Sequence, residues 1–170
     1  LEHRAMSQRE VQSILAMCQQ HDIDCMVRAP TQGRTRLYRF LEDGATGFMV
    51  PFVSNADIAR HIVEAVKFPP QGNRGLDGAG LDADFGIESW KPDSTYLEDA
   101  NQQTFVVGQI ETAEALDELD DIAAVPGLDV LFVGPADRGL RLGEGGDLDA
   151  AVQAVANAAS RHGKAWGIAG

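Results

Sequence analysis

The chain has 170 residues, of which 44% are apolar and 24% charged, so it is long enough for one globular domain with a sizeable core. Its 14 lysines and arginines against 26 aspartates and glutamates give a net charge of −12, which argues against nucleic acid or an anionic membrane as a partner. The sequence contains no signal peptide, no apolar run of membrane-spanning length and only two cysteines without a CxxC motif, so we expect a reduced, cytoplasmic protein.

Helix and strand patterns alternate over the first seventy residues. Ser7 followed by Glu10 forms a capping box, which predicts a helix running to about Gln20. Asn55 is placed to cap a second helix, and Pro69-Pro70 ends it. The other elements predicted here are a strand over 24–30, a short helix around 37–41 closed by Gly44, and a buried strand over 47–52.

Residues 71–100 break this alternation, because glycines and aspartates stand there with little periodicity. A loop of this length within a compact domain is typical of an active-site lid or of a mobile segment. Arg74 is the one early cation of the loop. Two interpretations of Arg74 stay open at this point: it faces a substrate carboxylate, or it is a solvated loop arginine.

Two apolar runs with a helical stretch between them form the centre of the chain. Residues 105–111 and 130–137 read as buried strands, and 113–124 read as the helix that connects them, closed by Pro126-Gly127. Such a β-α-β unit makes the strands parallel, so Glu111 and Asp137 emerge at the same edge. Paired carboxylates in this position can hold Mg²⁺ or Mn²⁺. The alternative is that Glu111 caps the next helix and Asp137 is an ordinary loop acid.

The alternation resumes after residue 137 with a helix capped by Asp147 and the start of another strand at Ala165. Alternating strands and helices predict an α/β fold with a parallel sheet, either doubly wound or a (β/α)₈ barrel. The sequence has no GxGxxG motif and no Walker loop, which argues against the nucleotide-binding versions of these folds. Polar residues follow several strands, which favours the barrel, although a complete barrel needs about 200 residues. These residues are Arg28, Gln109, Glu111 and Asp137, with His3 as a further candidate.

Several short motifs occur in the order found in the HpcH/HpaI aldolase family, and the sequence resembles that family over essentially its whole length. The most specific are the PPxGxRG motif at 69–75, the QIET motif at 109–112 and the GPAD motif at 134–137. Weaker matches are an EH pair at 2–3, VRxP at 27–30, LEDGA at 41–45 and VPFV at 50–53. A single one of these motifs is a weak signal, whereas the combination is specific.

The resemblance implies a (β/α)₈ TIM barrel of the phosphoenolpyruvate/pyruvate type that assembles as a homo-oligomer, a hexamer in the family. Relative to the family, residues 1–170 would form one incomplete barrel domain running from the end of strand 2 to strand 7, with 71–100 as a long loop within it. The resemblance also implies a divalent metal, Mg²⁺ or Mn²⁺ with Co²⁺ as a further option. Its ligands would be Glu111 and Asp137, the same pair that the strand spacing suggests.

The family's chemistry is a class II aldol cleavage of a 4-hydroxy-2-oxo acid into pyruvate and an aldehyde through a metal-stabilised enolate. By resemblance, Arg28 donates to the developing enolate oxygen, and His3 is the general base for the hydroxyl proton. Gln109 would line the metal site, and backbone amides around Ala136 and Asp137 would hold the pyruvate carboxylate.

Two substitutions depart from the family pattern. Glu42 stands where the family commonly has an aspartate associated with a subunit contact near the active site. Arg138 follows the GPAD motif where a leucine is usual, which would alter the aldehyde side of the pocket. Two other functions therefore stay open beside the aldolase: a CoA-thioester lyase of the citrate lyase β-subunit or malyl-CoA lyase type, and a catalytically silent fragment.

Overall fold

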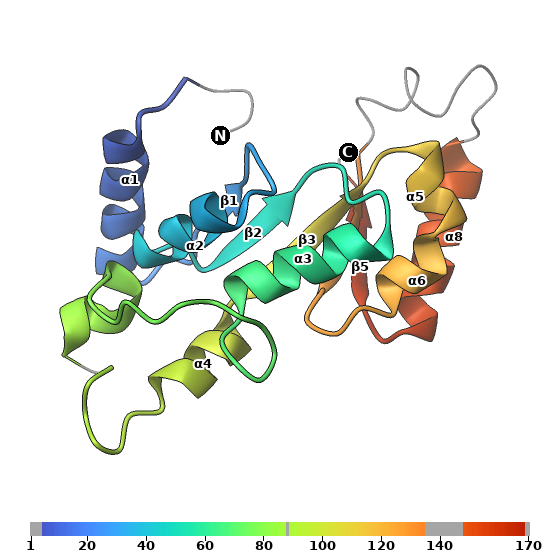
Figure 1. Cartoon of the computed structure of the whole chain (residues 1–170). Coiled ribbons are helices and arrows are strands. Elements are labelled where there is room, and N and C mark those ends of the chain that lie inside the picture. Colours follow the sequence, from blue (N-terminus) through green and yellow to red (C-terminus); the bar gives the residue numbers. More distant parts are fainter. Residues whose placement is uncertain (1–4, 88, 135–147, 169–170) are drawn as a thin grey trace.

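The computed structural model of the protein describes residues 5–87, 89–134 and 148–168, and its strands form a parallel sheet with helices packed against it (Figure 1). The five strands lie in sequence order, each paired in parallel with the next. They are β1 (Met26–Arg28), β2 (Gly47–Val50), β3 (Phe105–Ile110), β4 (Val130–Val133) and β5 (Ala165–Ile168). The expected α/β class is confirmed. Consecutive parallel strands match a (β/α)₈ barrel, whereas a doubly wound sheet reverses its strand order.

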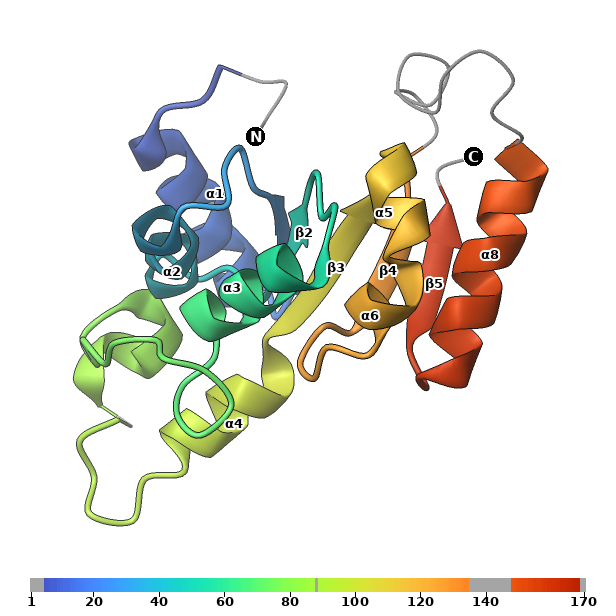
Figure 2. The same ribbon diagram turned by 45° about the vertical axis from the view of Figure 1, so that its right-hand side comes forward.

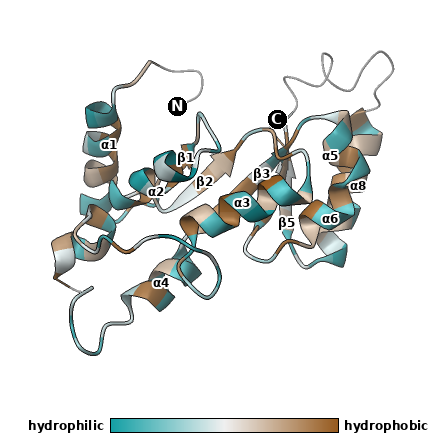
Figure 3. Ribbon diagram, viewed as in Figure 1, coloured by the Kyte–Doolittle hydropathy of each residue, from teal (hydrophilic) through white to brown (hydrophobic). Residues whose placement is uncertain are grey.

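A layer of helices follows the strands around the sheet (Figure 2). Helix α2 contacts α3, α3 contacts α6, and α6 contacts α8, so the helices neighbour one another in chain order. Hydrophobic and hydrophilic residues are interspersed along their ribbons (Figure 3), and in α3 the buried residues include Ala59, Ile62 and Val63. Among the described residues, no helix is long and apolar enough to cross a membrane. The bounds of these helices, together with those of α1 and α5, are α1 (Gln8–Gln20), α2 (Arg34–Glu42), α3 (Ala56–Val66), α5 (Ala113–Asp117), α6 (Leu119–Ala123) and α8 (Leu148–Arg161).

Alternate strand residues point into the core beneath these helices. Val27, Phe48 and Val106 pair across β1, β2 and β3 and are almost completely buried. They pack in one hydrophobic cluster with helix residues such as Leu37 and Ile62. Truncating a buried phenylalanine to alanine typically costs about 3–5 kcal/mol, so Phe48 is the side chain of this row whose loss would most weaken the sheet.

The predicted helix caps are present. The Ser7 hydroxyl accepts a hydrogen bond from the Glu10 amide at 3.3 Å, and the Glu10 carboxylate accepts from the Ser7 amide at 2.6 Å. The Asn55 side chain accepts from the Ile58 amide at 2.9 Å. These bonds satisfy amide groups that have no partner in the first turn of a helix. The predicted starts of α1 and α3 are therefore confirmed.

The helix predicted over 113–124 is interrupted. Residues Ala113–Asp117 form α5 and Leu119–Ala123 form α6, because Glu118 leaves helical geometry at φ −99° and ψ 14°. The Glu118 amide still donates to the Glu114 carbonyl, and the Glu118 carbonyl accepts from the Ile122 amide. The break is local, and the crossover between β3 and β4 stays helical as expected.

The segment predicted as a loop over 71–100 contains two helical elements. A short 3₁₀ helix, η1, covers Leu81–Gly86, and α4 covers Tyr96–Gln103, so the irregular stretch ends at Thr95. Helix α4 buries only Asn101, which leaves no apolar periodicity in the sequence that could have revealed it. This irregular segment and α4 lie at the amino edge of the sheet, where the strands begin, opposite the carboxyl edge where the strands end (Figure 1).

Candidate active site

The carboxyl edge of the sheet gathers the residues that follow each strand. Backbone hydrogen bonds tie neighbouring exits together: the Val53 amide donates to the Gln109 carbonyl at 3.2 Å, and the Gly134 amide donates to the Ile110 carbonyl at 3.3 Å. In barrels built from parallel strands, this edge is where reactive side chains collect. Its described residues include Arg28, Glu111 and Gly134.

Glu111 is buried at this edge with 3% of its surface exposed. Its Oε1 accepts a hydrogen bond from the Phe52 amide at 2.9 Å. Phe52 has a φ of 56°, a left-handed conformation that a bulky residue rarely adopts and that typically costs about 1–3 kcal/mol. The strained backbone at the exit of β2 therefore directs an amide at a carboxylate that follows β3.

Gln32 holds the Pro51–Phe52 turn in this conformation. Its side-chain amide donates to the Pro51 carbonyl at 2.9 Å and to the Phe52 carbonyl at 3.0 Å. The donor comes from the segment between β1 and α2, so three consecutive strand exits are connected through Gln32, Phe52 and Glu111. No sequence motif pointed to Gln32, and Phe52 acts through its backbone, which a residue pattern does not report.

Gly134 leaves room for Glu111 and Gln109. A Cβ atom at this position would lie 2.9 Å from Glu111 Oε2 and 3.5 Å from Gln109 Nε2. Both side chains therefore converge on the first residue of the GPAD motif. Gln109 is 3% exposed, and its Oε1 has no hydrogen-bond partner within residues 5–87, 89–134 and 148–168. A buried acceptor of this kind usually binds a donor, a water or an ion.

Arg28 lies at the end of β1 on the face of the sheet that is turned away from the helix-packed core. Its strand neighbour is Met49, whose own neighbour on β3 is Val107, so these three residues form one row across the sheet. Gln109 is two residues beyond Val107 and hence on the same face. The structure thus brings Arg28 and Gln109 to one face near the carboxyl edge.

Three of the predicted site residues lie outside the described residues: His3, Ala136 and Asp137. Arg138, one of the two departures from the family pattern, also lies outside them. Among the described residues, no group of three or more His, Cys, Asp or Glu side chains forms a metal site. Of the predicted metal pair, the structure therefore describes only Glu111.

Glu42 lies at the opposite edge of the sheet from Glu111. It is the last residue of α2, which precedes the start of β2 at Gly47, and its carboxylate pairs with Arg39 at 3.1 Å. Burial raises the pKa of the Glu42 carboxyl, and the neighbouring Arg39 partly offsets this rise. Within one chain, Glu42 and Glu111 cannot share a site. A role for Glu42 near an active site requires another copy of the chain.

Arg74 is buried, so its interpretation as a solvated loop arginine is wrong. Only 5% of its surface is exposed, its guanidinium pairs with Asp82, and it stacks over the Phe68 ring at 4.5 Å. Asp82 also accepts a hydrogen bond from the Tyr96 hydroxyl at 2.6 Å. These residues lie at the amino edge, beside Thr46 and Phe105 at the starts of β2 and β3. They are remote from the edge that holds Glu111.

Comparison with known proteins gives one family. The model of the HpcH/HpaI aldolase/citrate lyase family matches residues 1–169. The chain is 42% identical over 137 residues to a 2-dehydro-3,6-dideoxy-6-sulfogluconate aldolase of Pseudomonas putida, covering 81% of this chain and 52% of the relative. It is 42% identical over 112 residues to a 4-hydroxy-2-oxovalerate aldolase of Novosphingobium aromaticivorans, covering 66% of this chain and 40% of that relative.

A solved structure of similar fold is an HpcH/HpaI aldolase from Desulfitobacterium hafniense DCB-2. It superimposes with a TM-score of 0.86 at 31% sequence identity, over 98% of this chain and 65% of that one. The chain spans about half the length of the curated relatives it matches.

Proposed function

The chain belongs to the HpcH/HpaI aldolase/citrate lyase family, and we propose that it forms the catalytic part of a metal-dependent aldolase that cleaves a 4-hydroxy-2-oxo acid into pyruvate and an aldehyde. The observation that carries the proposal is the buried Glu111 carboxylate, which the Phe52 amide orients beside Gly134. Two relatives named as aldolases of 2-oxo or 2-dehydro acids support the substrate class.

The residues around Glu111 fit a hard divalent cation. Glu111 offers a carboxylate oxygen next to Gly134, and Gln109 offers a buried amide oxygen that lacks a partner among the described residues. Oxygen ligands of this kind suit Mg²⁺ or Mn²⁺, with Co²⁺ as a further option. Asp137 would complete the carboxylate pair. When bound, the cation supplies a Lewis acid that stabilises negative charge on the oxygens of a 2-oxo acid.

The protein's own residues would move the proton and stabilise the charge. His3 would accept the proton of the C4 hydroxyl, the C3–C4 bond would break, and the bonding electrons would move onto the C2 oxygen as the aldehyde leaves. Arg28 would donate to that oxygen, since a guanidinium stays charged and presents fixed donors. Return of a proton to C3 then gives pyruvate, whose carboxylate the backbone amides around Ala136 would hold.

We further propose that the protein works as a homo-oligomer. Glu42 lies at the amino edge, whereas Glu111 lies at the carboxyl edge of the same chain. If Glu42 acts near an active site, its amino edge must contact the carboxyl edge of another copy. Cross-linking of an engineered cysteine at Glu42 to the partner's strand exits would test this contact.

The experiment that tests the function is proton exchange of the pyruvate methyl group in deuterated water, followed by NMR with and without Mn²⁺. It asks only for enolisation, so the identity of the aldehyde does not matter. We expect metal-dependent exchange that falls by at least about 100-fold in Glu111→Gln, because the amide keeps the hydrogen bond to Phe52 but loses the charge. Glu114→Gln is the matched control, since Glu114 is exposed three residues further on.

Failure of exchange in a folded, Mn²⁺-binding protein would reject the pyruvate assignment. The family's description also includes citrate lyase, so a CoA-thioester lyase is the second candidate. Cleavage of malyl-CoA or citryl-CoA under the same conditions would favour that candidate. Absence of both reactions would leave the silent fragment.

A further inference from the structure

The two cysteines of the chain contact each other although they belong to different parts of the fold. Cys18 stands in the last turn of α1, and Cys25 directly precedes β1. Both are free thiols with partly exposed side chains, and a hydrogen bond joins them. A modest shift of one thiol would bring the two sulfur atoms from this contact to the separation of a disulfide bond, about 2.05 Å.

Backbone hydrogen bonds hold the two cysteines in this position. The Cys18 carbonyl accepts from the His21 amide at 3.1 Å and from the Ile23 amide at 2.9 Å, which closes the turn between them. On the other side, the Cys25 amide donates to the Thr46 hydroxyl at 2.9 Å, and the Thr46 amide donates to the Cys25 carbonyl at 3.1 Å. The contact between the thiols therefore follows from the path of the backbone.

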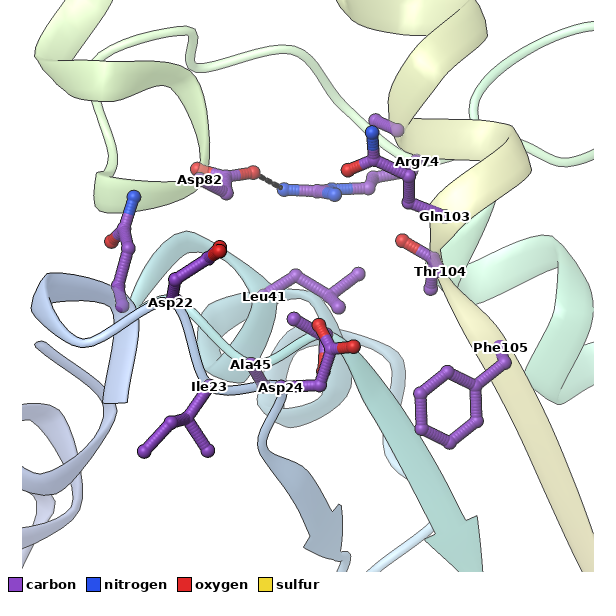
Figure 4. Close-up of a pocket in the computed structure, with 14 residues that line it drawn as sticks. Asp22, Ile23, Asp24, Leu41, Ala45, Arg74, Asp82, Gln103, Thr104 and Phe105 are labelled. Atoms are coloured by element: carbon purple, nitrogen blue, oxygen red, sulfur yellow. Dashed lines mark hydrogen bonds and ion pairs between the residues drawn. The ribbon is translucent and has the colours of Figure 1, made fainter.

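The turn between α1 and β1 has room to adjust. Residues 19–24 are all exposed, and residues 22–24 border a pocket of about 530 Å³ at the amino edge of the sheet (Figure 4). Within α1, the buried side chains are Val11 and Leu15, both nearer its start than Cys18 is. The last turn of α1 can therefore move without disturbing the packed core.

We propose that Cys18 and Cys25 are a site of reversible oxidation, at which a small-molecule disulfide such as oxidised glutathione converts the two thiols into one intramolecular disulfide. One cysteine thiolate attacks a sulfur of the glutathione disulfide, forms a mixed disulfide and releases one glutathione. The other cysteine attacks the protein sulfur of the mixed disulfide and releases the second glutathione. The two protein thiols are oxidised, and the two glutathiones leave as thiols with their protons.

The disulfide would tie the end of α1 to the start of β1. The site lies at the amino edge, away from Glu111, so this inference does not depend on the proposed aldolase reaction. Burial raises the pKa of the Cys25 thiol, and the neighbouring Cys18 raises it further. Cys25 is therefore a slow nucleophile at neutral pH, and the oxidation has to be followed to equilibrium.

The test incubates the purified protein in glutathione buffers of increasing disulfide content until the products no longer change. Acid stops the exchange, and a maleimide added to the unfolded protein labels every remaining thiol before intact mass spectrometry. We expect a single chain that has lost two hydrogen atoms and carries neither maleimide nor glutathione. Cys18→Ser should give only unmodified protein and the mixed disulfide of Cys25 with glutathione.

Ala16→Cys combined with Cys18→Ser is the matched control. It keeps two cysteines in the chain but moves one to an exposed position two residues earlier, on another side of α1. We expect its ratio of disulfide to dithiol to be at least about tenfold lower than in the wild type at the same glutathione composition.

Oxidation should also stabilise the folded protein. A disulfide that fits the native geometry should raise the unfolding temperature of the wild type by about 5 °C. The amides in the last turn of α1 should then exchange more slowly with deuterium, because the turn opens less often. Cys18→Ser treated in the same buffers should show neither change.

Four outcomes would overturn the proposal. The first is that both thiols are labelled even in the most oxidising buffer. The second is that the wild type accumulates mixed disulfides or cross-linked dimers in place of the intramolecular bond. The third is that the control with Ala16→Cys closes its disulfide as readily as the wild type. The fourth is a lower unfolding temperature after oxidation, which would show that the native geometry disfavours the bond.

Discussion

The two edges of the sheet bury a charged side chain in different ways. At the carboxyl edge, the Glu111 carboxylate accepts from a backbone amide held in a strained conformation, and it lies against Gly134, where a Cβ atom would come within 2.9 Å of its Oε2. At the amino edge, the Arg74 guanidinium is paired with a carboxylate and stacked on an aromatic ring. Burial is nearly equal, 3% against 5% exposed. The described partners of the two buried groups therefore differ: a backbone amide contacts Glu111, whereas a carboxylate and an aromatic ring contact Arg74.

The largest effect is expected at the amino edge. Asp82→Asn leaves Arg74 buried without its ion-pair partner, and breaking a buried pair by removing one partner typically costs about 3–5 kcal/mol. Urea unfolding measures the loss. Tyr96→Phe removes only the hydroxyl bond to Asp82 and should cost about 1 kcal/mol. Equal losses in the two variants would show that Arg74 does not depend on Asp82 and would remove the contrast between the edges.

Gly134→Ala tests the carboxyl edge. The added Cβ would lie 2.9 Å from Glu111 Oε2, so the carboxylate must shift. We expect the metal-dependent exchange of pyruvate protons to fall by about 100-fold while the protein stays folded. Gly75→Ala is the matched control, because nothing lies within 4 Å of a Cβ at that position. Exchange at the wild-type rate in Gly134→Ala would place the reactive site elsewhere.

Gln32→Ala tests whether the Gln32 side chain holds the strained turn at Phe52. Loss of the bonds to the Pro51 and Phe52 carbonyls should let the Phe52 amide turn away from Glu111. We expect the Mn²⁺ concentration for half-maximal exchange to rise about tenfold, the usual effect of removing a group that orients a ligand. Gln20→Ala, at an exposed helix end, should leave that concentration unchanged. An unchanged value in Gln32→Ala would show that the turn holds Glu111 without Gln32.

The sequence predicted the elements whose apolar residues recur at regular spacing. The five strands and the caps at Ser7 and Asn55 were found, because each follows from local residue patterns. Helix α4 was missed because its one buried residue, Asn101, is polar. The site was predicted only in part: Glu111 stands in a motif, whereas Gln32 acts across three strand exits and leaves no local pattern.

The smallest effect concerns pH and the Glu42 carboxyl. Burial raises its folded-state pKa above the ordinary value of 4.5, so Glu42 favours the folded state fully below pH 4.5 and this contribution is lost as the pH rises through the raised pKa. Glu42→Gln should therefore be more stable than the wild type at neutral pH by less than about 1 kcal/mol, with the advantage vanishing below pH 4.5. Urea unfolding from pH 4 to 7 measures the difference. A pH-independent difference would contradict the assignment.

We propose that the edge around Glu111 holds a divalent cation, and binding of Mn²⁺ followed by electron paramagnetic resonance measures this property. We expect the wild type and Glu114→Gln to bind Mn²⁺ equally, and Glu111→Gln to lose at least about tenfold in affinity while unfolding at the same temperature. Equal Mn²⁺ affinity in Glu111→Gln and the wild type would contradict it.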